Sequence, residues 1–188
     1  NLRQFGIAFQ LYGADHDEWI ANGHYYVYGE TPSTIQWYYA IEPYVGMEVH
    51  AYPFTGIFAC PSNHHRRQLW YGTDPTASYG LNYQGVALGY ATPNPNPHVI
   101  KWTKIIHPYC YVIMGDNNNR QRAYYYEWLY SISADNPLDA HDAGGNMLWA
   151  DQSVKWVSEE RLLANKWPWL FHSWTNCWIG CDGNPPRP

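Results

Sequence analysis

Charged residues are scarce in this sequence, and cations are the scarcest of them. The 188 residues include only 11 lysines and arginines, the formal net charge is −5, and charged residues make up 14% of the chain. The average share is about a quarter. A nucleic-acid surface needs clustered cations that neutralise phosphates, and the one basic cluster, 64–67, is short. We therefore expect no nucleic-acid partner.

Long apolar runs and familiar catalytic signatures are missing as well. No run approaches the roughly 18 apolar residues of a membrane helix, and no signal peptide is visible. The chain also lacks a Gly-x-Ser-x-Gly nucleophile elbow and a nucleotide-binding glycine loop. We therefore expect that the protein is not an enzyme. A hydrolase with paired carboxylates is the third alternative, because such residues need only meet in space.

Aromatic residues are abundant instead, with 11 tryptophans and 18 tyrosines. Their large apolar surface with a polar tip suits protein cores, wet interfaces and sugar-stacking surfaces alike. Two interpretations stay open: an aromatic surface covered by neighbouring subunits or glycan, and a tyrosine-rich core. The candidates for an interface or a sugar contact are the clustered residues Trp167, Trp169, Trp174 and Trp178.

Hydrophobic spacing predicts an N-terminal helix and an antiparallel sheet. Apolar residues recur at three- and four-residue spacing over 1–12, which predicts a helix with Gly13 as its stop. The apolar run 110–115 predicts a central strand. Further predictions are a short strand at 25–28, a helix that opens at a capping box over 33–36 and ends at Pro43, mostly irregular structure over 46–99, and a helix N-cap at Ser158.

A β-hairpin is predicted next to that central strand. Two runs with strand character, 146–150 and 153–157, flank the pair Asp151-Gln152, a spacing that suits a tight turn. Ahead of the hairpin, residues 142–145 form a predicted flexible, glycine-rich loop that follows His141.

Three side chains around this hairpin form the candidate site. Asp116 follows the central strand, and His141 and Asp151 flank the neighbouring one, so we expect the three to converge at one edge of the sheet. The ligand would be a divalent cation, with calcium held also by backbone carbonyls as the expected case, although histidine is an unusual calcium ligand. The alternative, which we favour, is a structural His–Asp hydrogen bond that fixes the loop onto the hairpin and pairs polar groups on burial.

Six short segments, in order along the chain, resemble one known family. His141, nine intervening residues and Asp151, followed by an aromatic-flanked strand, resemble the C-terminal signature of the H-X9-DG pseudopilin-like proteins. The other segments similar to this family are NLRQFGIA (1–8), WYYAIEPYVG (37–46), FACPS (58–62), SYGLN (78–82) and the strand region 105–116. The chain departs from the family at Gln152, where the family has glycine, and at Ser153, where it often has histidine.

The resemblance implies an α+β, pilin-like fold, in which an N-terminal helix packs on an antiparallel β-sheet with long aromatic-rich loops. It implies a single pilin-like domain over 1–188, with 1–13 as the end of the N-terminal helix and 14–188 as the globular head. In this family, the residues before NLRQ form a long apolar helix that anchors the precursor and packs in the filament core. Any membrane contact would be made through that missing helix.

The implied function is structural: a self-assembling subunit of an extracellular filament of the type IV pilus kind, or of a type II secretion pseudopilus, at the bacterial cell surface. Its partners would be copies of itself, as a homo-oligomer, or other pilin-like subunits. The alternative, drawn from composition, is a secreted carbohydrate-binding module that uses exposed Trp and Tyr faces as sugar platforms.

The four cysteines allow three disulfide pairings. Cys177 and Cys181 lie close together in a Trp/Gly loop and can close a small ring, which leaves Cys60 and Cys110 for a second bridge. In the extracellular setting that the resemblance implies, we expect two disulfides. A zinc site is the rival interpretation, although the C-x3-C pair has no partner pair at a suitable spacing.

Overall fold

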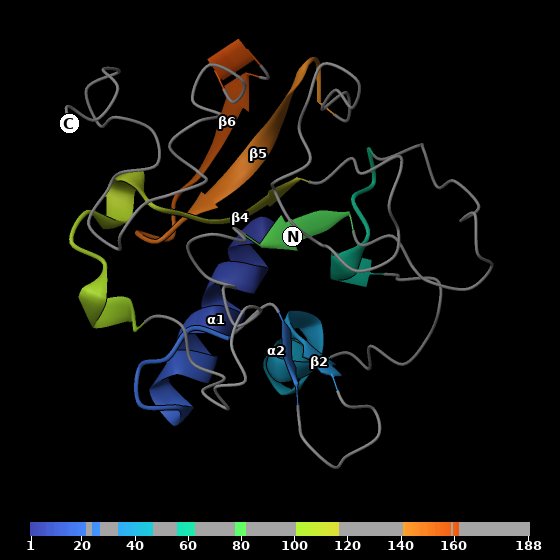
Figure 1. Cartoon of the computed structure of the whole chain (residues 1–188). Helices are drawn as coiled ribbons and strands as arrows, with labels where there is room; N and C mark the ends of the chain where they lie inside the picture. The colour runs from blue at the N-terminus through green and yellow to red at the C-terminus, as the bar shows by residue number, and fades with distance from the viewer. Residues whose placement is uncertain are drawn as a thin grey trace.

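The computed structural model describes residues 1–21, 24–26, 34–46, 56–62, 78–81, 101–116, 141–158 and 160–161. These residues form an N-terminal helix, a four-stranded antiparallel sheet, a second helix and a two-stranded ribbon, which is an α+β arrangement (Figure 1). Among the described helices, none combines the length and the apolar character needed to cross a membrane.

The N-terminal helix, α1, spans Leu2–Asp15 and buries the apolar face that the spacing predicts. The prediction that Gly13 stops the helix is wrong, because α1 continues to Asp15. Gly13 serves close packing instead: a Cβ atom at this position would lie 2.7 Å from the indole nitrogen of Trp102. A glycine inside a helix can therefore mark a close contact rather than an end.

Four antiparallel strands form the main sheet in the order β3-β4-β5-β6. They are β3 (Tyr79–Leu81), β4 (Val112–Asp116), β5 (Gly144–Trp149) and β6 (Val154–Ser158). The predicted central strand is confirmed, since β4 pairs with β3 on one side and with β5 on the other. Strand β3 falls in a region predicted to be mostly irregular, and its three residues are too few for a periodicity to register.

The hairpin formed by β5 and β6 is confirmed, with two differences at its ends. Gly144 and Gly145 belong to β5 and pair with β6, so the predicted flexible loop is partly strand. The turn has three residues rather than two: the Trp149 amide donates to the Ser153 carbonyl, and the Gln152 amide donates to the Trp149 carbonyl. Gln152 closes the turn in the left-handed region, at φ 68°.

The second helix, α2, spans Trp37–Val45 and follows the strand β2 (Thr34–Gln36), which pairs with β1 (His24–Tyr26). The predicted capping box is wrong, because its residues 34–36 are strand, and the predicted strand at 25–28 is confirmed only over its described part. Pro43 lies inside α2 rather than ending it. The helix ends before Gly46, whose φ of 66° is the left-handed conformation that closes many helices.

The core lies between α1 and the sheet, and α2 packs against α1 as well (Figure 1). Its centre is aromatic: the Phe5 ring lies 5.5 Å from Trp37, 5.2 Å from Phe58 and 5.4 Å from Tyr79, measured between ring centroids. Such edge-on and tilted contacts add to the stabilisation from burial. Within the described residues, part of the aromatic excess is therefore core.

Candidate functional site

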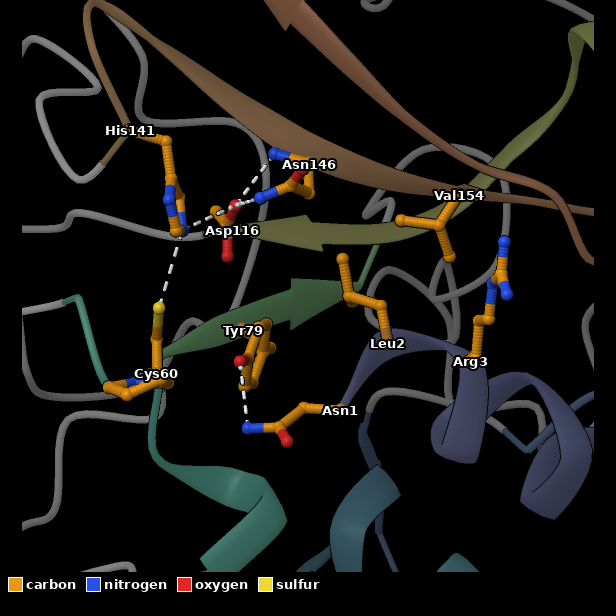
Figure 2. Close-up of a pocket in the computed structure, with 10 residues that line it drawn as sticks. Asn1, Leu2, Arg3, Cys60, Tyr79, Asp116, His141, Asn146 and Val154 are labelled. Carbon is orange, nitrogen blue, oxygen red and sulfur yellow. Dashed lines mark hydrogen bonds and ion pairs between the residues drawn. The ribbon is translucent and has the colours of Figure 1, made fainter.

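A cavity of about 380 Å³ opens where α1 begins, beside the end of β4 and the start of β5. Cys60, Asp116 and His141 line one side of it, and Asn1 and Tyr79 lie next to them (Figure 2). The three side chains come from three different segments: the loop after the short helix η1 (Gly56–Phe58), the last residue of β4, and the loop before β5. Antiparallel pairing places the end of β4 beside the start of β5, which brings these segments together.

One imidazole nitrogen is the centre of this cluster. His141 Nε2 lies 3.2 Å from Asp116 Oδ2 and 3.3 Å from Cys60 Sγ. These three atoms all lie within 4.8 Å of one another. Because both partners approach the same nitrogen, the cluster is not a Cys–His–Asp relay, in which the base binds the nucleophile through one nitrogen and the carboxylate through the other.

Asp116 is the buried carboxylate of the site, with a side chain that is 2% exposed. Its Oδ2 accepts hydrogen bonds from the backbone amide of Asn146 at 2.6 Å and from the Asn146 side chain at 3.0 Å. Burial raises the pKa of the Asp116 carboxyl, and the bonds from Asn146 and the charge of His141 offset part of that rise. The carboxylate is therefore desolvated but held by directed donors.

His141 is held by a strained loop and by a tryptophan. The two residues after it, Asp142 and Ala143, adopt left-handed backbone conformations with φ of 53° and 57°. Such conformations cost energy in residues other than glycine, and they persist where the surrounding structure imposes them. The indole N–H of Trp156 donates to the His141 carbonyl at 2.9 Å. The Trp156 ring lies over Gly144, where a Cβ atom would be only 2.5 Å from the Val157 carbonyl oxygen.

Cys60 is a buried free thiol, which contradicts the predicted Cys60–Cys110 disulfide. Cys110 precedes the start of β4, whereas Cys60 lies near Asp116 at the other end of this strand. The length of the strand separates the two by ~20 Å, far beyond the reach of a disulfide. The second predicted pair, Cys177 and Cys181, lies outside the described residues.

The start of α1 is tied to the same site. The Asn1 side chain donates to the Tyr79 hydroxyl and to the Ala59 carbonyl, both at 3.1 Å. Burial, followed by the neighbouring Cys60 sulfur, raises the pKa of Tyr79 above its usual value. The hydroxyl therefore stays protonated beside the thiol.

Asp151 does not belong to the cluster. It lies in the exposed β5–β6 turn, where its Oδ1 accepts bonds from the Ser153 amide at 2.9 Å and hydroxyl at 2.6 Å. Its backbone amide donates to the carbonyl of Pro108, which precedes β4. Asp151 and His141 flank β5 and therefore lie at its opposite ends, ~20 Å apart along the six residues of the strand.

The predicted set is therefore brought together in part. Asp116 and His141 meet, and their predicted pairing is present; Cys60 takes the place given to Asp151. The signal for Cys60 in the sequence is its place in FACPS, one of the segments behind the family resemblance, but the predicted disulfide pairs it with Cys110 instead. The clustered tryptophans Trp167, Trp169, Trp174 and Trp178 lie outside the described residues.

Comparison with known proteins gives no match: no family model, no curated protein and no solved structure is significantly similar to the chain. The site is therefore interpreted from its own geometry. One imidazole, one thiol and one carboxylate beside an open cavity can hold a metal ion or form a hydrogen-bonded corner.

Proposed function

We propose that the protein is a structural subunit of an extracellular pilus-like filament or secretion pseudopilus and acts by self-assembly. The observation that carries this proposal is the outer face of α1. Ile7 and Leu11 are 58% and 47% exposed on this helix, while its other face is buried against the sheet and α2. Residues four apart share one face of a helix, so the two side chains form a single apolar strip.

Charge on this face of α1 is confined to the two ends of the helix. Arg3 and Asp15 are the charged residues exposed on α1, and they lie in its first and last turns. The exposed residues between them are Gln4, Ile7, Gln10, Leu11 and Ala14, and none of these is charged. A helix face exposed to water normally carries charged side chains opposite its buried stripe. An outer face without charge between its ends suits contact with another helix, and burial of Ile7 and Leu11 would contribute roughly 1–2 kcal/mol per side chain.

In the proposed filament, the covering partner is α1 of a neighbouring copy. The strip of one copy would pack against a different part of the next α1, since a strip packed on the same strip would close into a dimer. Such a head-to-tail contact does not close on itself, which allows a filament to grow. The family resemblance over residues 1–8 and in the segments up to Asp151 agrees with this arrangement.

The test is negative-stain electron microscopy of the natural protein, with Ile7→Glu as the variant. Filaments of regular width are expected for the unchanged protein and should be lost with Ile7→Glu. The matched control is Ile106→Glu, because Ile106 is 62% exposed and lies outside α1. Dispersed monomers from the unchanged protein, or filaments that survive Ile7→Glu, would contradict the proposal.

The second candidate is the carbohydrate-binding module. Among the described residues, Tyr109 and Trp156 are half exposed, as a sugar platform requires. Tyr109 lies beside the start of β4. Trp156 pairs with Asn146, which lies near the end of β4, so the two aromatic residues do not form one platform. A shift of tryptophan fluorescence on addition of polysaccharide would favour this function, whereas a shift with protein concentration alone favours assembly.

A further inference from the structure

We propose that Cys60, Asp116 and His141 form a zinc site whose fourth position opens into the neighbouring cavity. This site is independent of the proposed filament function, since the three residues lie on the loops and sheet rather than on the outer face of α1. It also differs from the calcium site considered in the sequence analysis, both in its ligands and in its metal.

The convergence of three donor atoms is the first reason. A tetrahedral zinc ion, bound at about 2.0 Å to nitrogen and oxygen and about 2.3 Å to sulfur, holds its ligands about 3.3–3.6 Å apart. The observed separations from His141 Nε2 are 3.2 Å to the carboxylate oxygen and 3.3 Å to the sulfur. The sulfur and the carboxylate oxygen lie within 4.8 Å, so an approach of at most about 1.3 Å brings them to this spacing.

The donor set selects the metal. Calcium takes six to eight oxygen ligands, and a thiolate with an imidazole is a poor match for it. Zinc accepts sulfur, nitrogen and oxygen together in four-coordinate sites. Zinc binds cysteine as the thiolate and histidine as the neutral imidazole, so its binding at this site would depend on pH.

The surroundings of the ligands are those of a built metal site. The side chain and backbone of Asn146 both donate to Asp116, and Trp156 holds the carbonyl of His141. Such outer contacts orient metal ligands and raise affinity. Asp116 is a buried carboxylate, and a buried negative charge is costly unless a positive charge lies beside it. A bound divalent cation would supply that positive charge.

The fourth position distinguishes this site from a closed structural one. Three protein ligands leave one tetrahedral position, and the cavity of about 380 Å³ lies beside all three residues (Figure 2). Catalytic zinc sites keep one position open for water or another small ligand in the same way. Tyr79 and Asn1 line the cavity next to Cys60 and provide polar contacts for that ligand.

The proposal is tested by titrating the full chain, freed of metal by a chelator, with cobalt(II) and with zinc. We expect one cobalt ion per chain, with a near-ultraviolet thiolate-to-cobalt band and strong visible bands of tetrahedral coordination. Cys60→Ser should remove the near-ultraviolet band while Cys110, Cys177 and Cys181 remain. It should also weaken zinc binding at least ~100-fold, because loss of even an outer contact costs about 10–100-fold. Asp151→Asn is the matched control and should bind zinc like the unchanged chain.

Two results would overturn the proposal: no thiolate-to-cobalt band in the unchanged chain, or the same band in Cys60→Ser. Should Cys60→Ser not fold, zinc-edge X-ray absorption of the unchanged chain gives the answer without a variant. One sulfur with nitrogen and oxygen neighbours agrees with the site. No sulfur neighbour, or two or more, contradicts it.

Discussion

Each end of β5 is flanked by one predicted site residue, His141 at the start and Asp151 at the end, and the surroundings of the two differ sharply. At its start, His141 contacts Asp116 and Cys60 beside a cavity, and the carboxylate is buried. At its end, Asp151 is exposed, and within the described part of the chain its side chain bonds only Ser153 of its own turn. The comparison teaches that two residues close in sequence lie far apart in space when an extended strand separates them. Residues from separate segments meet instead where antiparallel strands turn back.

The largest loss of stability should come from a side chain added at Gly144, at the end of β5 near His141. We expect Gly144→Ala to lower the free energy of unfolding by about 3 kcal/mol, because a Cβ atom there meets the Val157 carbonyl and the Trp156 ring. Urea unfolding measures this change. Gly46→Ala is the control: Gly46 has open space and only its φ of 66° resists a side chain, so a loss of about 1 kcal/mol is expected. Equal losses at the two glycines would contradict the packing described for β5 and β6.

Removal of the buried carboxylate should have the next largest effect. Asp116→Ala leaves the donors of Asn146 without their acceptor, and we expect a loss of about 2 kcal/mol. Chemical unfolding in the presence of a chelator measures this term apart from any metal. A loss below about 0.5 kcal/mol would mean that the contacts of Asp116 are not formed in solution.

The corresponding change at the other end of β5 should cost less. Asp151→Ala removes two hydrogen bonds to Ser153 in an exposed turn, and we expect a loss of about 1 kcal/mol or less. Thermal unfolding of this variant beside Asp116→Ala tests the comparison directly. A larger loss from Asp151→Ala than from Asp116→Ala would reverse it.

The smallest effect should be a gain in stability. Gln152 occupies a left-handed position at φ 68°, which glycine adopts without strain. We expect Gln152→Gly to raise the free energy of unfolding by about 0.5 kcal/mol, as measured by urea unfolding. The Gln152 side chain also packs against Gly6 in α1. A loss of stability in Gln152→Gly would therefore show that this packing outweighs the backbone strain at Gln152.

Much of the fold could be predicted from the sequence, because its main elements carry strong local patterns. Residue order alone predicts the helix α1, the central strand and the hairpin. Element ends were missed where packing overrode local signals, as at Gly13 under Trp102 and at Pro43 inside α2. A local sequence pattern does not predict which residue will contact an element that is distant in the chain.

The site was only half predictable for the same reason. The pairing of Asp116 with His141 follows from antiparallel β4 and β5, which the sequence predicts. The arrival of Cys60 depends on the path of the chain after η1, which has no periodic pattern. The prediction that Asp151 joins His141 rests on both residues flanking one strand, and that position separates them.

The proposed metal site lies next to the start of α1, the helix whose outer face is proposed to contact a neighbouring copy. Asn1 bonds Tyr79 and Ala59, next to Cys60, so the first residue of the helix is fixed to the segments that hold the cluster. A metal bound there would hold three segments of the subunit together while the outer face of α1 stays free for a neighbouring copy. Metal removal is therefore expected to weaken the subunit before it affects the apolar strip.

Anomalous diffraction at the zinc edge, from crystals grown with zinc, tests the difference between the two ends of β5 most directly. The account predicts one strong peak between the sulfur of Cys60, the carboxylate of Asp116 and the imidazole of His141, and no peak at Asp151. A cluster without a peak, with Cys60 in direct contact with His141, would contradict the account and leave a hydrogen-bonded corner in its place.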